Sequence, residues 1–345
     1  MAFTIGSGNR GVVLRQQTSF GTVGSGSLFF GLVDDESFQT TFDVNARADM
    51  TRYGAHTTKT GKRYGEGTIN MAMDDSSFLA LIMKGIFPVV ATTGSSDPYT
   101  HTMTEIDHDA GRAGGTVFPV YQAIVLRDEK EHTYNDLSLD SISISGSVGE
   151  YVMLSATFMG KPEDSSSPSA LSTEATYNPV ISEPVHFQSA EVVFRSSTNT
   201  TASTSVSSVS LDISLNRDID SSYALGSDTC VREAPPQLRE ISGSVEFITP
   251  IHATSVEEPL YGNLIDGGNS TKYQPGTSNP ALTLTFTSTA NHDVVITLYN
   301  LQWEAPTSNV SGRDTQKMSL NFTGLFDDTF GGMAKCVIRN ALSAL

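Results

Sequence analysis

Lysine and arginine are scarce in this sequence. The chain of 345 residues has 21 basic residues against 38 acidic ones, which gives a formal net charge of −17. Sequence-independent binding to nucleic acid depends on clustered Lys and Arg that displace counterions from the phosphates. The composition therefore excludes a protein that grips DNA and predicts one that repels it. Adaptation to high salt would leave a similar acidic excess, and the charge alone does not separate the two explanations.

Cysteines and long apolar runs are also rare. Cys230 and Cys336 are the only cysteines, too few for a disulfide-framed secreted domain, so we expect reduced thiols. The longest apolar stretch, residues 78–91, is interrupted by Lys84 and Pro88, and it is shorter than the roughly 20 residues that a membrane helix needs. No signal peptide is recognisable. We expect synthesis in a cytoplasm and no membrane partner.

Motifs that carry chemistry are missing. No GxSxG occurs, and the GxGxxG at Gly6–Gly11 has neither a strand before it nor a helix after it. His101 and His108, with Asp107 and Asp109, do not have the spacing of a tight metal site. We therefore expect no enzymatic activity, no catalytic residue, no cofactor and no metal. A carbohydrate-active β-sandwich enzyme with paired carboxylates is the alternative, although aromatic residues make up only 8% of the chain.

Apolar and polar residues alternate through most of the chain, which is typical of strands with one buried face. Only two short helices are predicted. The first follows Asp74 and Asp75, which can cap it, and runs to Gly85. The second starts with a capping-box pattern at residues 255–258 and ends at Gly267. The fold class is therefore mainly β. The alternating segments are residues 38–45, 140–145, 152–158, 209–215, 241–247, 282–286 and 318–322.

An internal repeat organises these segments. Val12–Arg15 resembles Val192–Arg195, and the strands at Phe38 and Val209 are each followed by a long polar excursion, a second strand and a helix. The repeat predicts two tandem, duplicated β-sandwich or barrel-like domains, each with one short helix. Their predicted bounds are residues 1–161 and 185–328, joined by a linker at 162–184 and followed by a tail at 329–345 that is either a docking arm or a frayed end.

The polar faces of the predicted strands carry short hydroxyl, amide and acidic side chains and almost no Lys or Arg. An ordinary solvent-facing sheet and the hydrated lining of a channel both account for such a face. The residues of this face that we select are Asp43, Asn45, Ser143, Ser210, Asp212, Ser214, Glu246, Thr285 and Asn321.

The segment Val12–Thr22, and Asp140–Ser147 leading into Val152–Lys161, resemble the tail tube proteins of tailed bacterial and archaeal viruses. The resemblance implies a structural virion protein, assembled in the host cytoplasm into stacked rings. The inner sheets of these rings would join into one barrel, with other tail proteins as partners. Double-stranded DNA would pass through without specific binding, and the selected polar residues would face the lumen.

Within this resemblance, the duplication implies three chains per ring with pseudo-sixfold symmetry, or six chains if one half decorates the exterior. Another β-rich virion protein, such as a capsid decoration or receptor-binding protein, is the alternative function. The excursions at residues 47–64 and 217–239 are either contacts to a neighbouring subunit or ring or mobile surface loops. The residues that we select on them are Arg47, Tyr53, Lys62, Arg217, Tyr223 and Arg232.

Overall fold

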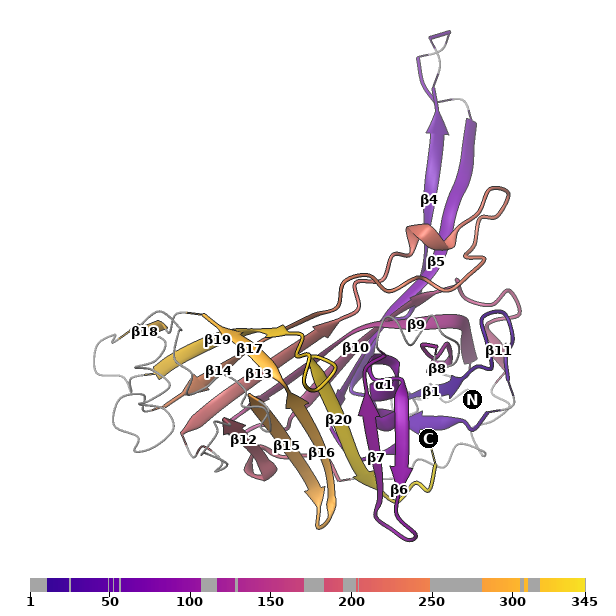
Figure 1. The fold of residues 1–345 in the computed structure, drawn as a ribbon. Coiled ribbons are helices and arrows are strands. Elements are labelled where there is room, and N and C mark those ends of the chain that lie inside the picture. Colours follow the sequence, from indigo (N-terminus) through magenta and orange to yellow (C-terminus); the bar gives the residue numbers. More distant parts are fainter. Residues whose placement is uncertain are drawn as a thin grey trace, which may run out of the picture.

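A computed structural model describes most of the chain, and in this part it consists of two packed β-sheets and one α-helix (Figure 1). None of the described helices is long and apolar enough to cross a membrane. The described residues are 11–24, 26–48, 50–51, 53–55, 57–106, 117–127, 130–170, 183–194, 203, 205–248, 281–304, 307–309 and 317–344. The predicted helix at 255–267 lies outside them.

The larger sheet is built around long antiparallel strands, each hydrogen-bonded to the next along one main path. This path ends at one edge of the sheet, where β3 and β4 pair with β5. β18 (Thr307–Asn309) pairs with β19 next to the opposite edge. The main path runs through β17 (Asn300–Trp303), β19 (Lys317–Leu325), β14 (Glu240–Phe247), β13 (Val206–Ser214), β9 (Lys130–Ser147), β10 (Met153–Gly160), β5 (Thr57–Ala72) and then β3 (Asp35–Glu36) and β4 (Gln39–Arg47).

The first part of β9 carries a second group of strands. It pairs with β8 (Tyr121–Arg127), which pairs with β1 (Gly11–Gln16), and β1 pairs with β2 (Phe29–Gly31). The short β11 (Ser169–Ala170) also joins β9. Part of the predicted linker, residues 163–170, therefore lies against β9.

The smaller sheet contains strands from both halves of the sequence. Its order is β12 (Ala190–Phe194), β15 (Leu282–Thr289), β16 (His292–Leu298), β20 (Ala334–Asn340), β7 (Tyr99–Thr104) and β6 (Val89–Thr93). The C-terminal segment, expected as a docking arm or a frayed end, instead forms the interior strand β20. The alternation from Ala334 to Ile338 is the physical reason, because it buries every second side chain.

One hydrophobic core fills the space between the two sheets. The apolar positions of β9, β10, β13, β14 and β19 face the apolar positions of β12, β15, β16 and β20. Phe194 of β12 and Phe247 of β14 meet across this space, with ring centroids 5.3 Å apart. Both sheets and the core are shared, so the two halves of the sequence do not form separate bodies.

The helix α1 (Ser77–Ile86) confirms the first predicted helix and packs into the core. Its N-cap is Ser76, whose hydroxyl accepts a hydrogen bond from the backbone N–H of Leu79. Asp74, which we expected to help cap the helix, accepts a hydrogen bond from the backbone N–H of Ser76 instead. Two short 3₁₀ helices, η1 (Phe187–Ser189) and η2 (Asp220–Ser222), complete the described elements.

The same order of strand pairing occurs in each half of the chain. In the first half, β1 pairs with β8, β8 with β9, β9 with β10, β10 with β5 and β5 with β4. In the second half, β12 pairs with β15, β15 with β16, then β17 with β19, β19 with β14 and β14 with β13. In this pairing order, the single long strand β9 of the first half corresponds to the two strands β16 and β17 of the second half.

Candidate functional site: the polar face of the large sheet

The large sheet has one apolar face against the core and one polar face on its other side. In β13, Val209, Leu211 and Ile213 are buried in the core, and the residues between them point the other way. The same alternation holds in β9, β10, β14 and β19. The polar face therefore continues across strands from both halves of the sequence.

The polar residues of neighbouring strands stand opposite one another, so that they form rows across the sheet. Hydroxyl groups in these rows contact each other: Ser210 Oγ lies 2.8 Å from Ser244 Oγ, and Thr68 Oγ1 lies 3.3 Å from Thr157 Oγ1. One row consists of Asn70, Ser155, Ser143, Asp212, Ser242 and Thr323, and the next contains Ser145, Ser210, Ser244 and Asn321.

Acidic side chains outnumber basic ones on this face. Lys317 is the one lysine that β9, β10, β13, β14 and β19 place on it, and its Nζ lies 2.8 Å from Glu246 Oε1. Lys62 has the same alternation in β5, and its Nζ lies 2.7 Å from Asp220 Oδ1. Hydrogen bonds from Lys317 and then Ser207 lower the pKa of Glu246. Asn321 Nδ2 donates to Glu304 Oε2 at 2.9 Å. Each of these two lysines is thus already paired with a carboxylate.

The structure brings most of the predicted lumen residues together on the polar face: Ser143, Ser210, Asp212, Ser214, Glu246 and Asn321. Thr285 requires a correction, because it lies in β15 of the smaller sheet. Alternation predicts which side chains share a face of one strand but not which sheet that strand joins.

Asp43 and Asn45 lie on β4, where the sheet continues as a two-stranded hairpin. The last pair between β10 and β5 is Gly160 with Gly65, whereas β4 continues to pair with β5 as far as Thr57. Residues 57–64 of β5 thus extend beyond β10 by roughly 25 Å. Figure 1 shows this hairpin of β4 and β5 projecting from the body of the molecule.

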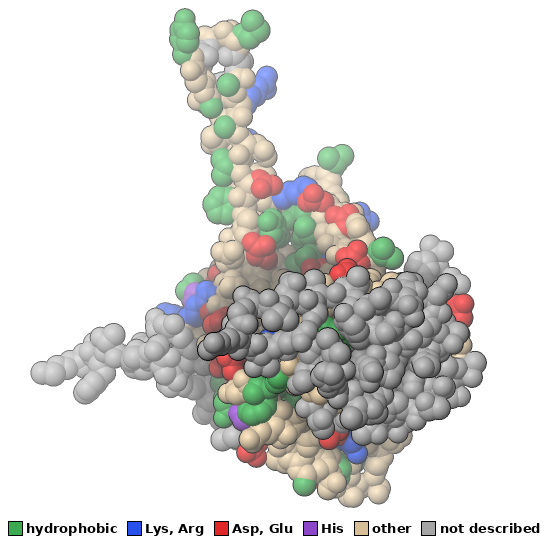
Figure 2. Space-filling model, turned by 90° about the vertical axis from the view of Figure 1, so that its left-hand side faces the viewer, with side chains coloured by type: hydrophobic (Ala, Val, Ile, Leu, Met, Phe, Trp, Pro, Cys, Tyr) green, Lys and Arg blue, Asp and Glu red, His purple; other side chains and the backbone are tan. Residues whose placement is uncertain are grey.

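Large apolar side chains are exposed along this hairpin. Phe42 and Val44 are 56% and 61% exposed, and Met50 and Tyr53 near the tip are fully exposed. Figure 2 shows hydrophobic side chains along the projection. Our sequence analysis grouped Phe42 and Val44 with the buried face of a strand, which is wrong because the strand leaves the core after Phe38. Exposed apolar groups gathered in this way mark interaction surfaces.

The second excursion, residues 217–239, packs against the base of the same hairpin. Lys62 Nζ lies 2.7 Å from Asp220 Oδ1, and the hydroxyl of Tyr223 donates to the carbonyl oxygen of Arg63 at 2.9 Å. The bond to Asp220 raises the pKa of Lys62, and burial raises that of Tyr223. The two excursions therefore contact each other within one chain.

The remaining residues that we selected on the excursions differ in exposure. Arg217 is buried, where it donates to the carbonyl oxygen of Leu139 at 2.7 Å and pairs with Glu233 at 2.7 Å. Burial lowers the pKa of Arg217 despite that partner. Arg232 Nε donates to the carbonyl oxygen of Ser221 at 2.9 Å. Arg47, at the end of β4, is exposed.

No group of three His, Cys, Asp or Glu side chains among the described residues is arranged to hold a metal ion. His101, a residue of our sequence search for metal ligands, is buried and hydrogen-bonded to Thr92, Asn340 and the carbonyl oxygen of Leu342. Both cysteines are buried free thiols.

The family comparison agrees with this architecture. A model of the phage tail tube protein family matches residues 8–324, nearly the whole chain. The chain belongs to the phage tail tube protein family. No curated protein matches it. Membership confirms the resemblance found in the sequence and makes this tail tube protein a structural component of the virion tail. The matched range spans both repeats of the pairing order and ends before β20.

Proposed function

We propose that this tail tube protein assembles into closed rings that stack into a hollow tube, and that the polar face of the large sheet lines the channel for double-stranded DNA. The observation that carries the proposal is the continuous polar face, on which Lys317 and Lys62 are each paired with a carboxylate. A duplex slides along such a face because its phosphates find no free cations to displace their counterions.

The open edges of the large sheet support ring closure. One edge contains β3 and the first residues of β4, and the main path ends at the other in β17. Unpaired strand edges invite pairing with another chain, and closure into a barrel removes them. The contact between β13 and β9 already joins the two halves inside one chain. In the repeated pairing order, β4 corresponds to β13 and β17 to part of β9, so β4 of one copy meeting β17 of the next would repeat this contact.

This correspondence favours rings of three chains with pseudo-sixfold symmetry. Each chain supplies two sets of four strands to the large sheet, one made of β9, β10, β5 and β4 and the other of β17, β19, β14 and β13. We infer from the repeated order that the two sets arose by duplication. Rings of six chains would require one set to lie outside the barrel, although β9 and β13 pair directly.

The hairpin of β4 and β5 is suited to contact the next ring. It projects at the end of the large sheet where β10 finishes, and the turn between β9 and β10 lies at the opposite end. This turn also exposes apolar side chains, Val148 and Tyr151. Head-to-tail stacking requires different, complementary surfaces at the two ends of the subunit.

Electron microscopy of the concentrated purified protein tests the proposal. We expect hollow tubes or stacks of rings, with threefold symmetry and sixfold pseudosymmetry in views along the axis. Discrete particles without a central channel would contradict ring assembly and would favour a decoration or receptor-binding role.

A further inference from the structure

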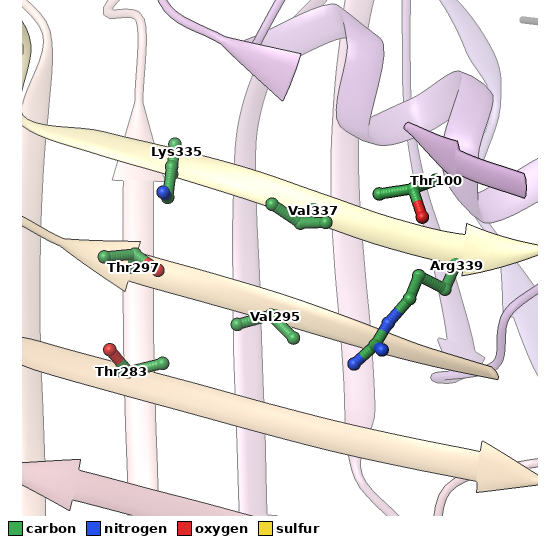
Figure 3. Close-up of a pocket in the computed structure, with 7 residues that line it drawn as sticks. All are labelled: Thr100, Thr283, Val295, Thr297, Lys335, Val337 and Arg339. Atoms are coloured by element: carbon green, nitrogen blue, oxygen red, sulfur yellow. The ribbon is translucent and has the colours of Figure 1, made fainter. Parts of the chain in front are cut away.

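A groove of about 400 Å³ lies on the face of the smaller sheet that points away from the core (Figure 3). Leu284, Ile296 and Cys336 of β15, β16 and β20 point into the core, and the residues between them face the groove. Six of the lining residues are Thr283, Val295, Thr297, Lys335, Val337 and Arg339.

Two polar groups in this groove have no partner within the part of the chain that the structure describes. Thr283 is only 5% exposed, and its hydroxyl oxygen makes no hydrogen bond. The ammonium of Lys335 forms no ion pair with any described residue, which is notable in a chain with a net charge of −17. Thr283 lies opposite Thr297, and Thr297 lies opposite Lys335. Figure 3 shows the hydroxyl of Thr283 and the amino group of Lys335 directed towards Thr297 from its two sides.

The residues around Lys335 give the groove one uncompensated positive charge beside an apolar surface. Arg339 is held by both carboxylate oxygens of Asp293, with Nε 2.7 Å from Oδ1, so its charge is compensated. Among the described residues that line the groove, the free charge is therefore that of Lys335. Val295 and Val337 stand opposite each other beside this row and form an apolar floor.

In the first half of the chain, the corresponding face is apolar. There Val13 of β1 stands opposite Ile124 of β8, and Leu28 and Phe30 pack against the cluster that these two residues form with Leu126. In the second half the corresponding pair is Val193 with Thr283. A hydroxyl without a partner has thus replaced an apolar side chain. Burial of an unpaired hydroxyl is unfavourable, which points to a polar ligand at this position.

We propose that this groove binds an extended, acidic segment of another tail protein, with one carboxylate held between Lys335 and Thr283. A carboxylate accepts hydrogen bonds from both an ammonium and a hydroxyl, and the valines accommodate an adjacent aliphatic side chain. If the polar face of the large sheet lines the channel, as proposed above, the groove on the smaller sheet lies on the outside of the tube. This position of the groove therefore rests on the proposed function. Binding itself is measurable without a tube.

Fluorescence anisotropy with the purified full-length protein tests the binding. The probe is a labelled peptide of alternating Asp and Val, and the comparison peptide carries Asn in place of each Asp. We expect the acidic peptide to bind at least tenfold more tightly, and Lys335→Gln to weaken its binding at least fivefold. Lys130→Gln is the matched control, because Lys130 is an exposed lysine on β9, and it should leave binding unchanged. Equal binding of both peptides, or equal losses in both variants, would overturn the proposal.

Thr283→Val separates a ligand-binding hydroxyl from a structural one. The variant keeps the shape of the side chain, so we expect weaker binding of the acidic peptide together with an unchanged or higher melting temperature. Unchanged binding would contradict the role of Thr283. In purified tails, a carbodiimide should join Lys335 to an Asp or Glu of a different protein. A link to this chain or to another copy of it, or no link at all, would overturn the choice of partner.

Discussion

Asp212 of β13 stands directly opposite Ser143 of β9, and this pair joins the two halves of the chain on the polar face of the large sheet. If the face lines the channel, a cation at this position would attract the phosphates of passing DNA. We predict that Asp212→Lys leaves the tubes intact and slows DNA ejection several-fold, with the largest effect at low salt. Ejection from purified particles, followed by a DNA-binding dye, measures this.

Glu191→Lys is the control for this experiment. Glu191 is an exposed acidic residue on β12 of the smaller sheet, so its replacement changes the net charge equally on a different surface. Ejection should remain normal. If both variants slow ejection alike, the effect comes from net charge and not from the polar face.

The exposed apolar side chains of the hairpin should affect assembly but not folding. We predict that the double variant Phe42→Ser and Val44→Ser shortens or abolishes tubes, whereas the free energy of unfolding of the dispersed chain changes by less than about 0.5 kcal/mol. Sedimentation and electron microscopy measure tube length, and urea denaturation measures stability. Val117→Ser, at another exposed apolar residue, should leave the tubes unchanged. Normal tubes in the double variant would remove the hairpin from the stacking contact.

Gly243 is required by close packing in the large sheet. A Cβ added there would lie 2.3 Å from the carbonyl oxygen of Ser210 and 2.4 Å from the ring of Phe322. We predict that Gly243→Ala lowers the free energy of unfolding by about 1–3 kcal/mol, as measured by urea denaturation. Ser242→Ala, at the adjacent exposed position, should cost much less, and equal losses would contradict the packing explanation.

His292 links three parts of the fold and should make stability depend on pH. Its Nδ1 lies 2.7 Å from Asp75 and its Nε2 lies 3.0 Å from Asp97. Burial tends to lower the pKa of His292, but the hydrogen bonds and charges of the two aspartates outweigh it and raise the pKa above the usual 6.5. The stabilisation is therefore complete below about pH 6.5 and is lost as the pH rises through the pKa of the folded protein.

The stability difference between the wild type and His292→Gln should accordingly shrink between pH 6 and pH 9. Urea denaturation at several pH values in this range measures it. A difference that stays constant, or that grows with pH, would show that the protonated imidazole does not stabilise the fold.

Alternation in the sequence was sufficient to predict the strands of the polar face, because a buried face imposes a period of two on β13, β14 and β19. It was not sufficient to assign Thr285 to a sheet, since partner strands are chosen by contacts distant in sequence. For the same reason it did not show that β4 leaves the core after Phe38, where only β5 accompanies it. The strand β20 was missed because a C-terminal segment after the last repeat was interpreted as a tail.

The groove of the smaller sheet had no signal in the sequence. Thr283 and Thr297 lie on the consecutive strands β15 and β16, but Lys335 is distant from both along the chain and joins them only through the pairing of β16 with β20. The absence of a partner for the hydroxyl of Thr283 is likewise a property of the packed structure.

The position of the polar face in the assembled tube can be measured directly by size-selective labelling of cysteine variants. Cys230 and Cys336 are buried, so they provide a low background. In assembled tubes, Asp212→Cys should react with a small maleimide but not with a maleimide attached to a globular protein too large for the channel, whereas Glu191→Cys should react with both. Ready reaction of Asp212→Cys with the large reagent in intact tubes would place the polar face on the outside and contradict the account.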